Sequence, residues 1–163
     1  MVQDISSTIE GEFDNVIHAA SGFLNDVDMF NASFFSNKRC IEIASQNNCP
    51  LVYISSTEVY APIRTYGIMK LAGEFLVKTY LYRFIIRPYH IYGPRMNPND
   101  GRIQSEIIKE LLNKKSKRRG DGSAIRTFTH VNDLIDALIL VLAKGTCETI
   151  YDVTNELEET TII

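Results

Sequence analysis

An apolar run ends in hydroxyl and carboxylate side chains at Leu51-Val52-Tyr53-Ile54-Ser55-Ser56-Thr57-Glu58. Continuous apolar runs of this length are typical of β-strands covered on both faces, so Leu51–Ser55 is predicted to be a buried strand. The preceding Asn47-Asn48-Cys49-Pro50 is a turn sequence that ends a helical pattern. Further strands are predicted at Asn15–Ala20, Phe84–Arg87 and Thr149–Val153.

Segments with helical periodicity separate these strands. Helices are predicted at Met29–Gln46, Tyr66–Tyr82, Ile103–Leu112 and Val131–Ala143. Strands that alternate with helices predict the α/β class, here a parallel sheet with helices on both faces. In such sheets ligands bind at the carboxyl ends of the strands, where Ser55–Glu58 and His18–Ser21 stand.

A Tyr and a Lys stand four positions apart in Thr65-Tyr66-Gly67-Ile68-Met69-Lys70-Leu71-Ala72-Gly73-Glu74. On a helix this spacing places Tyr66 and Lys70 on the same face, one turn apart. A nearby ammonium stabilises a phenolate and lowers the pKa of the Tyr, which can then take a proton from a substrate hydroxyl near neutral pH. The alternative is a surface helix that carries an aromatic side chain and a solvated Lys.

Composition favours one soluble domain. The chain has 163 residues, 45% hydrophobic and 23% charged, with a net charge of -3, which argues against a general affinity for nucleic acid or anionic membranes. We expect no transmembrane segment, because no apolar run approaches the length of a span. The three cysteines (Cys40, Cys49 and Cys147) lack metal-ligand spacing and are expected to be reduced thiols of a cytoplasmic protein that binds no metal.

Six stretches, in the right order, together resemble the extended short-chain dehydrogenases/reductases, the NAD-dependent epimerases and dehydratases that modify nucleotide sugars. These stretches are Val16–Ser21, Leu51–Tyr60, Thr65–Glu74, Phe84–Arg95, Gly120–Asp133 and Tyr151–Asn155. The resemblance implies a single Rossmann-type domain over residues 1–163, with residues 93–130 on the substrate side. It also implies a homodimer in which the two helices Met29–Gln46 and Tyr66–Tyr82 pack against the same pair of a second subunit.

The resemblance assigns roles to individual residues. Tyr66 is the base for hydride transfer, Lys70 lowers its pKa and bonds the nicotinamide ribose, and Ser56 or Thr57 holds the sugar hydroxyl that is oxidised. The implied cofactor is NAD, with NADP left open, and the implied substrate is a nucleotide sugar. The cofactor-binding residues would be Asp4, Ile5, Ala19, Ala20, Ser21, Tyr66, Lys70 and Pro88, and the substrate-binding residues His90, Arg95, Arg102 and Arg126. Arg126 suits bidentate contact with a diphosphate, whereas His90 stands where the family usually has Asn.

Glu58 distinguishes subclasses of the family. Dehydratases and decarboxylases usually carry Glu at this position, because a carboxylate can act beside a C4 ketone, where the C5 proton is acidic. The stretch Arg95–Arg102 resembles UDP-glucuronate decarboxylases and dTDP-glucose dehydratase-like enzymes. We therefore expect an enzyme that acts through a 4-keto intermediate. Two alternatives stay open: a plain 4-epimerase, which needs no Glu58, and a catalytically inactive paralogue that serves as a binding or dimerising module.

The sequence also departs from the family. It contains no G-x-G-x-x-G or G-x-x-G-x-x-G, so we expect the first βαβ unit to be missing, and the loops before Asn31 and before Tyr66 are short. These gaps are interpreted either as real deletions or as residues left out of the sequence. A basic run at Lys114–Arg119 replaces the apolar strand usual there, and we interpret it as a solvated loop rather than a nucleic-acid-binding patch.

Overall fold

The computed structural model describes residues 9, 11–21, 26–114, 121, 123, 125–155 and 159–161, with only the backbone given for 28, 32 and 159–161. The predicted cofactor residues Asp4 and Ile5, and residues 115–119 of the basic run, lie outside this part of the chain. The chain divides into two compact units. The first holds residues 1–87 and 138–152, and the second holds 88–137 and 153–163.

The first unit is built on a four-stranded sheet in the order β1-β2-β3-β7. Its strands are β1 (Val16–His18), β2 (Leu51–Ile54), β3 (Arg83–Pro88) and β7 (Ile150–Val153). β1 pairs in parallel with β2, and β2 in parallel with β3. Backbone bonds from Ile85 to Thr149 and from Tyr89 to Val153 advance in the same direction along β3 and β7, as parallel strands require. The predicted parallel sheet is confirmed.

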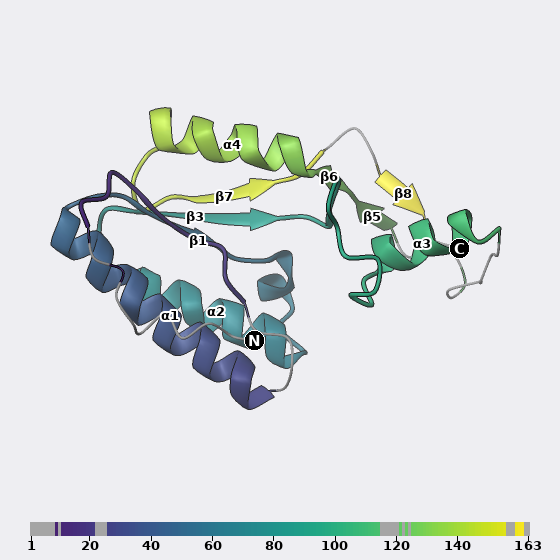
Figure 1. The fold of residues 1–163 in the computed structure, drawn as a ribbon, viewed down its shortest axis with the longest axis horizontal. Helices are drawn as coiled ribbons and strands as arrows, with labels where there is room; N and C mark the ends of the chain where they lie inside the picture. Colours follow the sequence, from purple (N-terminus) through teal and green to yellow (C-terminus); the bar gives the residue numbers. More distant parts are fainter. Residues whose placement is uncertain are drawn as a thin grey trace. The chain divides into compact units, whose positions relative to one another are not determined.

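Helices cover both faces of this sheet. α1 (Asp26–Asn47) and α2 (Thr65–Val77) lie side by side on one face (Figure 1). Residues 138–144 of α4 (Val131–Lys144), the part of that helix in this unit, lie on the other face (Figure 1). α1 ends at the predicted turn, where Asn48 adopts a left-handed backbone with φ 49°. The Cys49 N–H then donates to the Ala44 carbonyl at 3.1 Å, which satisfies one of the free carbonyls at the helix end.

The prediction that α2 extends to Tyr82 is wrong, because the helix ends at Val77. The Thr79 hydroxyl donates to the Leu76 carbonyl at 2.7 Å, which draws the chain into a turn. Tyr80 Oη then lies 2.7 Å from the Cys49 carbonyl oxygen and 3.1 Å from that of Ala44. Tyr80 in this way joins the turn after α2 to the end of α1.

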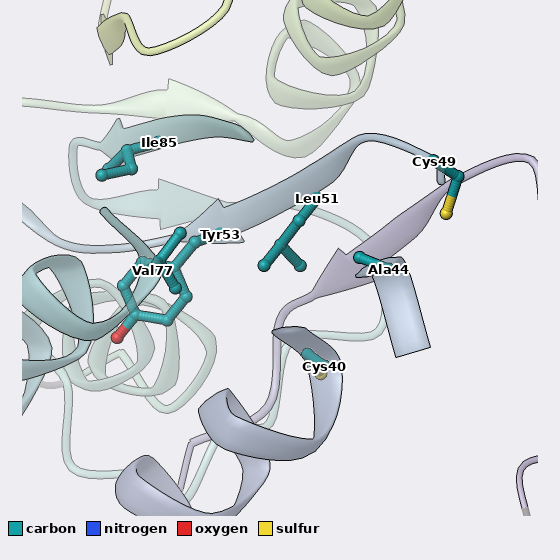
Figure 2. Packing of buried hydrophobic residues seen from close by; sticks show 7 residues of the cluster. All are labelled: Cys40, Ala44, Cys49, Leu51, Tyr53, Val77 and Ile85. Atoms are coloured by element: carbon teal, nitrogen blue, oxygen red, sulfur yellow. The ribbon is translucent and has the colours of Figure 1, made fainter. Parts of the chain in front are cut away.

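The core of the first unit lies between the sheet and the α1–α2 pair. Its buried members are Cys40, Ala44, Cys49, Leu51, Tyr53, Val77 and Ile85 (Figure 2). α2 approaches the sheet most closely at Gly73. A Cβ built there would stand 2.8 Å from Tyr53 Cζ and 2.9 Å from Asn37 Nδ2, so only hydrogen fits at this position.

The second unit contains α3 and two small strand pairs. α3 (Ile103–Leu112) has the predicted bounds. β4 (Ile91–Tyr92) pairs in parallel with β6 (Thr129–His130), and β5 (Ile125–Thr127) pairs antiparallel with β8 (Glu159–Thr161). These short strands were not predicted from the sequence, because runs of two or three residues carry too little hydrophobic alternation to identify them.

We predict that Gly73→Ala lowers the free energy of unfolding by about 1–3 kcal/mol, because the added methyl group overpacks the contact between α2 and β2. Tyr53→Phe in the same chain removes the hydroxyl that the methyl meets and should restore part of this loss. Urea unfolding of the single and double variants measures both effects. Ala72→Ser, on the exposed side of the same turn, is the control. A Gly73→Ala protein as stable as that control would contradict the packing.

Candidate active site

Tyr66 and Lys70 lie on the first turns of α2, beside the carboxyl end of β2. The Lys70 side chain is only 4% exposed, and its Nζ donates to the Ile54 carbonyl at 2.7 Å. The same Nζ lies 5.1 Å from the ring centre of Tyr53 and 5.8 Å from that of Tyr66. Because the ammonium is buried next to the half-buried Tyr66, its field acts on that ring with little screening by water.

The strand-end hydroxyls continue into a short 3₁₀ helix, η1 (Thr57–Tyr60). Ser56 caps it, since its Oγ accepts the Glu58 N–H at 3.2 Å. Ser56, Thr57 and Glu58 are all half-buried. Gly67 of α2 packs against this turn, and a Cβ there would stand 2.9 Å from the Glu58 carbonyl oxygen. The structure therefore brings the five predicted catalytic residues together in one unit.

The predicted cofactor residues of this unit follow β1. Ala19 and Ala20 are exposed and Ser21 is half-buried. The Ser21 Oγ is buried but has no hydrogen-bond partner among the described residues. A buried hydroxyl without a partner at a strand end suits a ligand that supplies the missing hydrogen bond. Together with Tyr66 and Lys70, these residues fit a dinucleotide cofactor at this edge of the sheet.

His18 is buried at the end of β1. Its Nε2 lies 3.1 Å from Ser36 Oγ, and its ring is 5.5 Å from that of Tyr53. Burial, reinforced by the positive charge of Lys70, lowers the pKa of His18 to about 4. Burial likewise raises the pKa of Tyr53. Lys70 thus has neutral His18 and Tyr53 around it.

The predicted substrate residues, and Pro88 of the cofactor set, belong to the second unit. His90 and Arg95 take positive φ angles of 20° and 67° in the turns around β4. Arg102 Nε lies 3.6 Å from Asp100 Oδ2 just before α3. Arg126 is exposed on β5 and donates to the neighbouring Ile125 carbonyl at 2.8 Å.

The sequence analysis missed a second set of polar residues beside the catalytic ones. Glu74, fully buried on α2, accepts hydrogen bonds from Ser55 and from Arg87 of β3. Two signals pointed to it. Glu74 stands four positions after Lys70 on the same helix face, and Arg87 is a charge at the end of an apolar strand, where it needs a partner.

The part of the chain that the structure describes gives no support for a metal site or a membrane-spanning helix. No group of three or more His, Cys, Asp or Glu side chains there is arranged to hold a metal ion. No described helix is long and apolar enough to cross a membrane.

The sequence pattern of the NAD-dependent epimerase/dehydratase family matches residues 3–154. The chain belongs to this family. The resemblance inferred from the motifs is confirmed, and so is the Rossmann-type fold.

Individual relatives fall into more than one subclass. The chain is 30% identical to a dTDP-D-glucose 4,6-dehydratase of Dictyostelium discoideum over 125 residues, 72% of this chain and 28% of that protein. It is 37% identical to UDP-glucuronic acid decarboxylase 3 of Arabidopsis thaliana over 105 residues, 57% of this chain and 31% of that protein. A crystal structure of dTDP-glucose 4,6-dehydratase from Bacillus anthracis, in complex with NAD, superposes with a TM-score of 0.80 at 21% identity, covering 91% of this chain and 53% of that one. The chain therefore spans about half of that structure, and the matches span about a third of these curated relatives.

We predict that His18 makes the fold sensitive to acid. The pKa of His18 falls from 6.5 to about 4 on folding. Below pH 6.5 the unfolded chain therefore binds a proton at His18 that the folded chain does not bind. At 1.36 kcal/mol per pKa unit, this lowers stability by up to about 3 kcal/mol as the pH drops from 6.5 to 4. His18→Gln keeps a polar partner for Ser36 and should lose less stability over this range in urea titrations. If the free energy of unfolding fell equally with pH in both proteins, His18 would not be the group that makes the fold sensitive to acid.

Proposed function

We propose that this protein performs NAD-dependent modification of a nucleotide sugar through a 4-keto intermediate, as a dehydratase or decarboxylase. The observation that carries the proposal is the buried Lys70 ammonium, 5.8 Å from the Tyr66 ring and bonded to the end of β2. Family membership supports the same reaction class. Bound NAD would supply the acceptor for the hydride of C4 of the sugar.

Tyr66 is the base in this proposal. It takes the proton of the C4 hydroxyl, and the Lys70 charge makes this possible near neutral pH by stabilising the phenolate. Lys70 Nζ donates to the Ile54 carbonyl, which holds the ammonium at the carboxyl end of β2. In this proposal the ammonium also bonds a hydroxyl of the nicotinamide ribose.

Ser56 and Thr57 position the sugar in this proposal. Both hydroxyls stand at the carboxyl end of β2, where ligands of parallel sheets bind. The Ser56 oxygen accepts the Glu58 N–H, so its hydroxyl hydrogen remains able to bond the sugar oxygen. Glu58 follows on η1 with a half-buried carboxylate, which would act at C5 once C4 is a ketone.

The remaining partners belong to the same proposal. The substrate would be bound by His90, Arg95, Arg102 and Arg126, with Arg126 on its diphosphate. A homodimer would cover the exposed aromatic side chains of α1 and α2, with Phe35 61% and Phe75 64% exposed. The epimerase alternative rests on the family itself, which includes enzymes that need no carboxylate at position 58.

We predict that Tyr66→Phe lowers kcat of the full-length enzyme at least about a hundredfold, because the proton acceptor is lost. The fold should survive, since one hydroxyl is removed and little volume changes. Nucleotide-sugar turnover and thermal unfolding measure the two effects. Tyr82→Phe, at a solvent-exposed ring in the turn after α2, is the matched control. Retention of most of the turnover in Tyr66→Phe would disprove the assignment of the base.

We predict that Glu58→Gln separates the two subclasses. The substitution keeps size and polarity but removes the carboxylate, so a dehydratase or decarboxylase should still oxidise C4 and accumulate the 4-keto sugar while the later elimination slows. Rapid-quench product analysis detects that accumulation, and Glu42→Gln on α1 serves as the control. Unchanged interconversion of C4 epimers would favour the epimerase. Equal losses in both steps would mean that Glu58 only supports the fold.

A further inference from the structure

A chain of polar contacts crosses the first unit just behind the proposed catalytic residues. It links five side chains from five segments: Ser55 after β2, Tyr60 of η1, Glu74 of α2, Arg87 of β3 and Asp152 of β7. None of these residues has a role in the function proposed above.

The carboxylate of Glu74 is the centre of this network. Its side chain is fully buried, and each oxygen accepts a hydrogen bond from Arg87, to Nε at 2.8 Å and to Nη2 at 2.7 Å. Ser55 Oγ donates to the same carboxylate at 2.6 Å. The paired bonds from Arg87 neutralise the buried charge and fix the orientation of the carboxylate, as bidentate Arg–carboxylate pairs do. The Ser55 hydroxyl therefore meets an acceptor that cannot rotate away.

Arg87 extends the network to two more segments. Its Cζ lies over the ring of Tyr60, 4.8 Å from the ring centre, and the Tyr60 hydroxyl donates to Asp152 Oδ2 at 2.5 Å. The hydrogen bonds of Glu74 hold the pKa of Arg87 above its usual value, so the guanidinium keeps its charge. η1, which carries Thr57 and Glu58, is in this way stacked on the same ion pair.

The contacts fall at the point where the strand becomes the catalytic turn. Ile54 and Ser55 are consecutive residues, and each is bonded to α2: the Ile54 carbonyl to Lys70 and the Ser55 hydroxyl to Glu74. Lys70 and Glu74 are one helical turn apart on the same face. Two parallel contacts one turn apart fix both the distance and the tilt of α2 against the strand end, which a single contact does not.

We propose that the Glu74–Arg87 pair is a positioning device that acts through Ser55 and Tyr60. It fixes the position of the Ser56–Glu58 turn relative to Tyr66 and Lys70. The proposal rests on the function proposed above, because the residues that the pair positions are those given catalytic roles there. The pair itself takes part in no chemical step. Catalysis is sensitive to displacements of about 1 Å in such groups, so loosening the strand end lowers kcat more than it changes substrate binding.

A second Arg–Glu ion pair, with a more exposed carboxylate, stands at the other end of β3. Arg83 Nη2 lies 3.4 Å from Glu148 Oε2, and the Arg83 side chain is 8% exposed. This pair connects the start of β3 to the loop before β7, and the bonds described for the Arg83 side chain, to Glu148 and to the Tyr80 carbonyl, reach neither η1 nor α2. It is the matched control, because breaking it tests what the loss of a partly buried ion pair does by itself.

The test compares Ser55→Ala, Arg87→Lys and Glu148→Gln in the full-length enzyme. Ser55→Ala removes one hydroxyl, and Arg87→Lys keeps the charge but loses the paired bonds. We expect both to lower kcat about tenfold or more with KM within about threefold of the wild type. Glu148→Gln should leave both constants unchanged, and Ser55→Thr, which keeps the hydroxyl, should retain kcat. A kcat within twofold of wild type in both Ser55→Ala and Arg87→Lys would overturn the proposal, and so would equal losses in Ser55→Ala and Ser55→Thr.

Amide hydrogen exchange gives a readout that does not depend on turnover. Peptides covering residues 55–60 should exchange faster in Ser55→Ala and Arg87→Lys, while the α3 peptide at 103–112 exchanges as in the wild type. Unchanged exchange at residues 55–60 would overturn the positioning role whether or not the protein has activity. If the wild-type protein turns over no nucleotide sugar, the proposed function fails. Faster exchange at residues 55–60 in the two variants would then support the positioning role by itself.

Discussion

The structure of the first unit depends on a buried positive charge. Burying an ammonium is costly unless its donors are satisfied, and the Ile54 carbonyl, 2.7 Å from Lys70 Nζ, supplies one acceptor. That carbonyl belongs to the last residue of β2. The carboxyl end of a parallel strand thus provides both the acceptor that makes the charge tolerable and the edge at which ligands bind. The position of Lys70 at this strand end therefore explains both why its charge can be buried and why it lies in the proposed site.

Two ionisable side chains near Lys70, Glu74 and His18, are each held in an arrangement that limits their effect on its charge. A buried carboxylate, Glu74, stands only one turn away on α2, and by itself would oppose the effect of the ammonium on a neighbouring phenol. Arg87 pairs with both oxygens of that carboxylate, so the pair is neutral as a whole. His18, on the other side, stays neutral near physiological pH because burial and Lys70 lower its pKa to about 4. The Glu74 charge is thus paired with Arg87, and His18 adds no charge of its own beside Lys70.

The sequence predicted most of the sheet and its helices, because β2 and β3 are continuous apolar runs and α1 ends in a recognisable Asn-Asn-Cys-Pro turn. Helical spacing placed Tyr66 and Lys70 on one face, parallel topology placed the β2 hydroxyls at the ligand-binding edge, and the resemblance to the family joined them in one site. The sequence failed to predict the end of α2, where side-chain bonds of Thr79 and Tyr80 to helix-end carbonyls outweigh the helical pattern. It also missed the partner of Glu74, because Arg87 lies thirteen residues away on another element and only the register between β2 and β3 brings them together.

Two glycines let α2 come close enough for all of these contacts. Glycine in a helix interior costs about 1 kcal/mol relative to alanine, yet α2 carries Gly67 and Gly73 within thirteen residues. A side chain at Gly67 would meet the Glu58 carbonyl, and one at Gly73 would meet Tyr53 and Asn37. Lys70 and Glu74 lie between and just after these two positions on the helix, and both reach the strand end with bonds of 2.7 Å or shorter. A helix held farther from the sheet by even one methyl group would lengthen both bonds. The two glycines lower the helix propensity of α2, but they let the helix lie close enough to the sheet for the Lys70 ammonium and the Glu74 carboxylate to reach their hydrogen-bond partners.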